Sequence, residues 1–177
     1  MKAFLLGSDA FSVFAARGLR RARSHVQASV WATRPVTARN NPLERYCAEH
    51  ELPFTYLERG PEDAPDYAPL LQRAGLEAPE QRLLLACSFG SMVPNAVIDT
   101  FPASYVVHPS LLPKFRGAAP IAAALLQGER VTGVSVAGLS RGKFDAGPIF
   151  LQRELAVPEE WVFTDLFEAL GLLTRDL

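Results

Sequence analysis

The residue best suited to catalysis in this sequence is His108. It ends an apolar run, Ser104–His108, and leads into a loop that contains two prolines. An ordinary imidazole has a pKa of about 6.5, and positioned acid–base groups accelerate reactions about 10²- to 10⁴-fold. We therefore predict that His108 is a general acid or base. The other histidines, His25 and His50, lie among polar residues in or beside expected helices, which favours surface positions.

An acid that could serve this histidine lies in a second segment. Asp145 stands between Gly142 and Gly147, in a loop expected to join two strands. Aspartate and glycine are ordinary turn residues, so the segment by itself favours a hairpin turn. A histidine that holds or passes a proton, however, needs an anionic partner that fixes its tautomer and stabilises its charged form. Together the two segments predict a pair formed by His108 and Asp145.

The elements that must position this pair alternate between strands and helices. Apolar and β-branched runs favour strands at residues 2–6, 26–32, 53–57, 82–87, 104–108, 133–139 and 147–153. Helical spacing favours helices at residues 12–23, 42–50, 94–100, 120–127 and 161–177. The acidic, proline-rich stretch 58–69 favours a loop that could begin a helix. This alternation predicts an α/β fold with a mostly parallel central sheet flanked by helices, whose ligand crevice lies at the carboxyl ends of the strands.

Length and composition narrow the class of protein. The chain has 177 residues, 49% of them hydrophobic, which suits a single domain and argues against disorder. It contains no run of twenty apolar residues, so no membrane association is expected. Cys47 and Cys87 lie far apart and pair with no histidine at metal-ligand spacing, which argues against a disulfide framework and a zinc site. Neither GxGxxG nor GxxxxGK[ST] occurs, so the familiar dinucleotide and ATP sites are not expected.

Charge is distributed unevenly although the net charge is −1. Residues 1–50 hold eight basic and three acidic side chains, residues 51–100 hold three and eight, and residues 101–150 hold five and two. Two basic segments that meet in the fold could attract a phosphate backbone, and solvated helix faces are the alternative. The arginine-rich helix at residues 12–23 is similar to a transit peptide, but a strand that starts at residue 2 favours a structural helix.

Three segments carry a family resemblance. The run HPSLLPKFRGAAPI from His108, the strand GVSV from Gly133 and the segment FDAGPI from Phe144 resemble the tetrahydrofolate-dependent formyltransferases, in particular methionyl-tRNA formyltransferases. The segments GSDAFS, ACSFGSMVP and FP also follow the family's order, so the resemblance covers nearly the whole chain. The first loop and the basic approach to Asp145 are similar to the mitochondrial branch, which implies a mitochondrial location. The cytoplasm is the alternative, because no clear cleavable presequence precedes the first strand.

The resemblance implies a Rossmann-like catalytic domain over residues 1–177 that uses 10-formyltetrahydrofolate as formyl donor and needs no metal. An amine would attack the formyl carbon; His108 would stabilise the oxyanion and help to move a proton, and Asp145 would orient the histidine. The resemblance also implies folate contacts from Ser110, Leu111, Leu112, Pro113, Phe89, Gly90 and Met92.

One position departs from the family pattern. Members of the family have an asparagine two residues before the histidine, so that both side chains point to the same face of the strand. This sequence has Val106 at that catalytic position, and valine offers no side-chain hydrogen-bond donor. Losing one oxyanion donor typically costs about 10² to 10³ in rate. A folate-binding relative without activity is therefore an alternative, and a formyltransferase that acts on a small amine is another.

The partner implied by the resemblance is initiator methionyl-tRNA, whose formylation serves translation initiation. Its phosphates could meet a basic rim, for which a solvated edge is the alternative. The residues of this rim are Lys114, Arg116, Arg141 and Lys143. Members that act on this tRNA have a carboxyl-terminal barrel domain and a basic insertion after the second strand. The sequence ends before such a domain, which suggests truncation, and residues 32–41 hold only two arginines.

We expect the protein to be a monomer.

Overall fold

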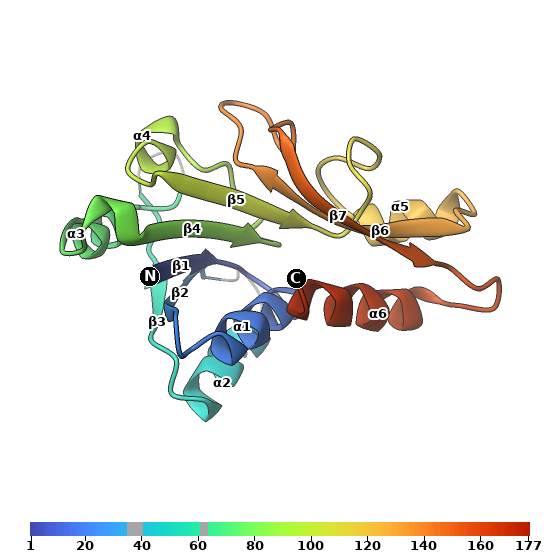
Figure 1. Ribbon diagram of the computed structural model, residues 1–177, viewed down its shortest axis with the longest axis horizontal. Coiled ribbons are helices and arrows are strands. Elements are labelled where there is room, and N and C mark those ends of the chain that lie inside the picture. The colour runs from blue at the N-terminus through green and yellow to red at the C-terminus, as the bar shows by residue number, and fades with distance from the viewer. Residues whose placement is uncertain (35–40, 61–63) are drawn as a thin grey trace.

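Seven strands form one sheet in the computed structural model, which describes residues 1–34, 41–60 and 64–177 (Figure 1). The sheet order is β3-β2-β1-β4-β5-β6-β7, and the five strands from β3 to β5 are parallel. Strand β6 runs antiparallel to β5, and β7 runs antiparallel to β6. The strands are β1 (Lys2–Leu6), β2 (Gln27–Thr33), β3 (Phe54–Leu57), β4 (Arg82–Cys87), β5 (Ala103–His108), β6 (Val131–Gly138) and β7 (Ile149–Ala156).

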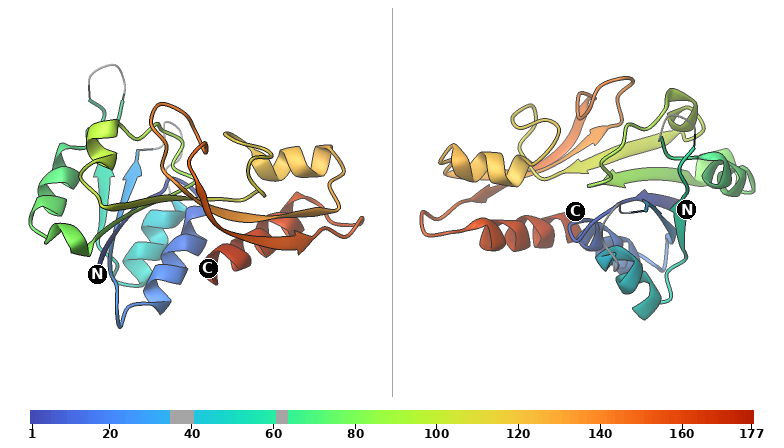
Figure 2. Two further views of the ribbon diagram at one scale, coloured as in Figure 1. Left: turned by 45° about the horizontal axis from the view of Figure 1, so that its top comes forward. Right: turned by 180° about the vertical axis from the view of Figure 1, so that it is seen from behind.

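Helices cover both faces of this sheet. One face carries α1, which packs against both α2 and α6, and the other carries α3 and α4; α5 follows the loop after β5 (Figures 1 and 2). The helices are α1 (Ser12–Arg21), α2 (Pro42–Glu49), α3 (Ala68–Gly75), α4 (Asn95–Ile98), α5 (Pro120–Leu126) and α6 (Phe163–Arg175). In the part of the chain that the structure describes, none of these helices has the length and hydropathy to cross a membrane.

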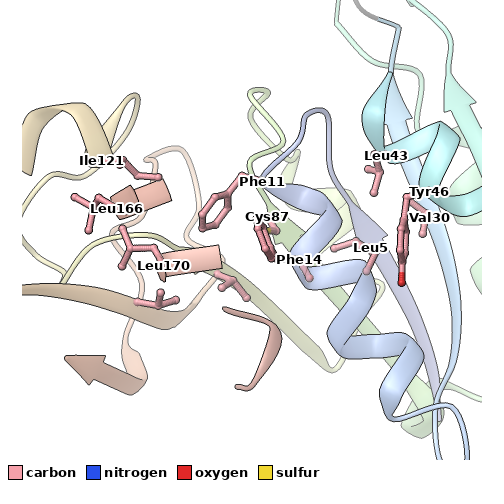
Figure 3. Packing of buried hydrophobic residues seen from close by; sticks show 14 of the residues in the cluster. Leu5, Phe11, Phe14, Val30, Leu43, Tyr46, Cys87, Ile121, Leu166 and Leu170 are labelled. Carbon is pink, nitrogen blue, oxygen red and sulfur yellow. The ribbon is translucent and has the colours of Figure 1, made fainter. Parts of the chain in front are cut away.

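Two hydrophobic clusters hold the helices to the sheet. Strand β1 is buried on both faces, so its side chains alternate between the clusters: Leu5 belongs to one, and Phe4 and Leu6 belong to the other. Figure 3 shows the first cluster, in which Phe11, just before α1, and Phe14 of α1 lie beside α6; both rings contact Phe167. This packing confirms that the arginine-rich first helix is a structural element of the domain.

The sequence predicts all seven strands and five of the six helices described here. The ends differ by a few residues: α1 stops at Arg21, and β7 continues to Ala156 because it pairs with β6 as far as Val131. Helix α3 was expected only as a possible start within the loop at 58–69, of which residues 61–63 lie outside the described chain. Its apolar face is short, with only Leu70 and Ala74 buried, so helical periodicity is weak there.

Candidate active site

The carboxyl ends of β1, β4 and β5 open into a cavity of about 490 Å³. This position agrees with the general rule for open α/β sheets, in which ligands bind beyond the carboxyl ends of the strands. The walls combine loops that lie far apart in the sequence. They consist of residues 8–9, 88–93, 106–109, 117–120 and 143–145, together with Ala86, Ile98, Leu139 and Ser140.

His108 ends strand β5 in the wall of this cavity, and its side chain is only 7% exposed. The Nε2 atom lies 2.8 Å from the carbonyl oxygen of Phe115. Because a carbonyl oxygen only accepts hydrogen bonds, Nε2 carries a hydrogen in this arrangement. The Nδ1 atom lies 3.5 Å from Oδ2 of Asp145, which is an ion-pair distance but longer than an ordinary hydrogen bond. The structure therefore brings the two predicted catalytic side chains together.

Asp145 approaches His108 from the loop between β6 and β7. Its backbone adopts the left-handed region, with φ of 49°, which aspartate tolerates better than most residues. Its side chain is 9% exposed, and Oδ2 accepts a hydrogen bond from the backbone N–H of Gly117 at 2.9 Å. The carboxylate therefore ties the loop after β5 to the loop after β6, and it presents a fixed negative charge to the imidazole.

Val106 lies two residues before His108 and also lines the cavity. In the sheet it stands between Ala86 of β4 and Ala137 of β6. Its side chain is partly buried and packs against the hydrophobic cluster on the α3 and α4 side. The cavity wall is thus apolar at this point, and it offers no side-chain hydrogen-bond donor from residue 106.

Ser110, Leu111, Leu112 and Pro113 do not line the cavity. Ser110 is fully buried, and its hydroxyl donates to the carbonyl oxygen of Lys114 at 2.7 Å. The Leu112–Pro113 peptide bond is cis. The hydrogen bond from Ser110 to Lys114 stabilises the loop that carries Phe115 and Gly117 toward His108. Direct folate contact by the four residues remains a prediction.

Phe89, Gly90 and Met92, the other predicted folate contacts, do line the cavity. They form the loop after β4, in which Gly90 has a φ of 77° that favours glycine. The hydroxyl of Tyr67 donates to the carbonyl oxygen of Met92 at 3.3 Å and anchors this loop. Cys87, just before the loop, is no candidate nucleophile, because burial raises the pKa of its thiol far above the ordinary value.

The four predicted RNA-binding side chains are exposed, but they differ in position. Lys143 lines the cavity itself. Lys114 forms an ion pair with Glu129 at 2.8 Å, and Arg141 forms one with Asp99, so part of their charge is already neutralised. Arg116 lies on the loop next to Gly117, one residue from the cavity wall. The segment at 32–41 that stands at the place of the family's insertion lies, for residues 35–40, outside the described chain.

Sequence reasoning missed one polar group of the cavity, formed by Ser8, Asp9 and Ser88. The Ser88 hydroxyl donates to Oδ2 of Asp9 at 2.6 Å, which joins the loops after β1 and β4. The sequence could have indicated this group, because both segments follow central strands, and the carboxyl ends of parallel strands meet at one edge of the sheet. Among the residues that the structure describes, no group of three or more His, Cys, Asp or Glu side chains is arranged to hold a metal ion.

Comparisons with known proteins agree with this geometry. The family model described as formyl transferase matches residues 1–170. A methionyl-tRNA formyltransferase of Streptococcus sanguinis is 30% identical over 184 residues, covering 100% of this chain and 56% of its own length. A mitochondrial methionyl-tRNA formyltransferase of Rattus norvegicus is 29% identical and covers 99% of this chain and 43% of its own length. The chain thus spans about half the length of these curated relatives.

A solved structure shows the same fold. The phosphoribosylglycinamide formyltransferase of Bacillus halodurans superposes with a TM-score of 0.82 at 19% identity, over 100% of this chain and 91% of that one. At this identity the similarity establishes the fold alone. It confirms the Rossmann-like α/β architecture that the sequence predicted.

Proposed function

Because the chain belongs to the formyl transferase family, we propose that residues 1–177 form a catalytic domain that transfers a formyl group from 10-formyltetrahydrofolate to the amino group of methionyl-tRNA. The observation that carries the proposal is the pair of His108 and Asp145. Two side chains, one at the end of β5 and one in the loop after β6, are each less than 10% exposed and meet in the wall of the cavity at the carboxyl edge of the sheet.

The cavity suits a folate. Its volume of about 490 Å³ falls within the range of about 300 to 1,000 Å³ that is usual for small-ligand sites. Much of its wall is apolar, which suits a flat aromatic ring system. The apolar residues of the wall include Phe89, Met92, Val93, Ile98, Leu139 and Phe144, besides Val106. The folate would supply the formyl carbon that the amine attacks; the bond between that carbon and N10 of the folate would then break, and N10 would take up the proton that the amine releases.

The chain's own residues then manage charge and protons. To donate a hydrogen bond to the formyl oxygen as negative charge develops there, His108 must turn its Nε2–H away from the carbonyl of Phe115. The ring can also hold the proton that the attacking amine releases. Asp145 faces Nδ1 and stabilises the ring when it carries both hydrogens. The carbonyl of Phe115 fixes the orientation of the ring from the other side. The low exposure of both side chains limits their contact with solvent.

Methionyl-tRNA is proposed as the acceptor on two grounds. Relatives with that name match the chain end to end, at 29% and 30% identity. In addition, Arg116 and Lys143 lie exposed beside the cavity, where phosphates of an RNA could meet them. We also propose a mitochondrial location, because the rat relative is a mitochondrial enzyme. Microscopy of a fluorescent fusion of the complete gene product would distinguish this location from the cytoplasm.

Val106 favours a second candidate function, a folate-binding protein without transferase activity. The apolar wall at residue 106 removes one donor from the place where the proposed chemistry needs it. On this alternative the cavity binds a folate analogue and no formyl transfer follows.

The test is formyl transfer to methionyl-tRNA by the natural chain and by His108→Ala and Asp145→Asn. We expect transfer by the natural chain and a loss of at least about 10²-fold in each variant, because each removes a participant in proton transfer. His25→Ala is the matched control, since His25 is exposed and lies away from the cavity. Equal transfer by the His108 variant would refute the proposed mechanism. Folate binding without transfer by the natural chain would establish the second candidate.

A further inference from the structure

A carboxylate lies at the start of helix α1, in the wall of the cavity. Asp9 precedes the helix, and its Oδ1 atom accepts hydrogen bonds from the backbone N–H groups of Phe11 at 2.9 Å and Ser12 at 3.2 Å. These N–H groups belong to the first turn of the helix, where no intrahelical partner exists for them. Asp9 therefore supplies the negative charge that the end of this ten-residue helix attracts.

The second carboxylate oxygen of Asp9 is held from the opposite side. The hydroxyl of Ser88 donates to Oδ2 at 2.6 Å, and Ser88 itself has a left-handed backbone with φ of 50°. The neighbouring Ser8 hydroxyl donates to the carbonyl oxygen of Phe89 at 2.7 Å, which fixes the two loops against each other. The position of the carboxylate is thus set by the backbone N–H groups at the start of α1 and by the Ser88 hydroxyl of the loop after β4. Asp9 remains solvent-accessible, so its charge reaches a molecule bound in the cavity.

The start of a helix beside a ligand crevice is a common binding place for a phosphate, because free N–H groups and the helix dipole both favour an anion. In this protein an internal anion already holds those N–H groups. A phosphate that approached the same end of the cavity would meet a like charge and no free donors from Phe11 or Ser12.

We propose that Asp9 is a specificity-determining residue that disfavours small amine acceptors carrying a phosphate group. The inference rests on the proposed function, since it concerns the choice of acceptor at the same site. It predicts that phosphoribosylglycinamide is a poor ligand of this protein, although the fold is shared with an enzyme named for that compound. Asp9 would not repel tRNA phosphates that lie along Arg116 and Lys143, because these two residues belong to loops other than the loop of Asp9.

The test measures binding of phosphoribosylglycinamide by calorimetry, at fixed ionic strength, to the natural chain and to Asp9→Asn. Asparagine keeps an oxygen that can accept from Phe11 and Ser12, and it removes the charge. We expect affinity to rise by about fivefold to tenfold, which is the effect of removing one like charge at contact distance in water. Asp9→Ser is the second variant, because serine also caps helices and opens more space.

Asp66→Asn is the matched control. Asp66 likewise accepts a backbone hydrogen bond at the start of a helix, from Ala68 at 2.9 Å, but it does not line the cavity. Tighter binding by both Asp9 variants and an unchanged affinity of Asp66→Asn would support the proposal. Equal affinity in the natural chain and both Asp9 variants, including no measurable binding by any of them, would overturn it, and so would an equal gain in Asp66→Asn. Because the readout is binding, a failure of formyl transfer to methionyl-tRNA would be recognised separately.

Discussion

Replacing Val106 by asparagine is the most informative single change in this protein. Residue 106 lies two positions before His108 on β5, and both side chains line the cavity. Alternate residues of a strand share a face, so an asparagine amide at residue 106 would point into the cavity on the same side as the imidazole. The variant would therefore add one hydrogen-bond donor beside the proposed acid–base group without moving the backbone.

The magnitude follows from the chemistry and from the burial of Val106. One well-placed donor to a developing oxyanion is worth about 10² to 10³ in rate, or about 3 kcal/mol. The cost to folding is smaller: Val106 is only partly buried, and an amide that faces an open cavity can be hydrated, so we expect a loss of about 1 kcal/mol in the free energy of unfolding. The gain in transition-state stabilisation should thus exceed the loss of stability.

The assay is single-turnover formyl transfer from 10-formyltetrahydrofolate to methionyl-tRNA, with Val106→Ala as the matched control. Alanine enlarges the cavity without adding a donor, so a gain found only with asparagine identifies the hydrogen bond as its cause. We expect turnover by Val106→Asn to exceed that of the natural chain by about 10²- to 10³-fold. The same rate in both variants, with folding confirmed by thermal denaturation, would show that residue 106 does not face the reacting atoms.

Three further expectations concern stability and ionisation. Gly133→Ala should lower the free energy of unfolding, measured by urea denaturation, by about 3 kcal/mol. The reason is that a Cβ atom at residue 133 would overlap the carbonyl oxygen of Arg153 on β7. A loss below about 1 kcal/mol would contradict this packing. Ser135→Ala should lower the free energy of unfolding by about 2 kcal/mol in the same assay. The buried Ser135 hydroxyl accepts a hydrogen bond from Gln152 at 2.8 Å, and its loss would leave its partners unpaired. An unchanged denaturation midpoint would count against this bond. Burial raises the pKa of the Cys47 thiol to about 12, above the pKa of the same thiol in the unfolded chain. The neutral thiol therefore contributes to the free energy of unfolding below pH 9, and this contribution falls as the pH rises from about 9 to 12. Thermal denaturation at each pH checks this, and a steeper fall for Cys47→Ala than for the natural chain would reverse its sign.

The sequence predicts much of the candidate site because its chemistry follows strand ends. His108 ends β5, and Asp145 lies in the loop after β6, as the apolar runs and the glycines indicated. Their pairing was a hypothesis from chemistry, and the 3.5 Å distance between Nδ1 and Oδ2 agrees with it. Asp9 also follows the end of a strand, β1, but the sequence did not indicate its partner. Its partner Ser88 is 79 residues away, and only the adjacency of β1 and β4 brings the two together.

The sequence by itself determines the alternation of strands and helices, because hydrophobic periodicity is a local property that the order of residues carries directly. It determines the chemistry available at the edge of the sheet for the same reason. Which side chains face the cavity was decided only by tertiary structure: Ser110 turned inward to Lys114, whereas Phe89 and Met92 line the wall. The physical reason is that contacts between loops distant in sequence depend on strand order and register, and each loop settles where its buried polar groups find partners.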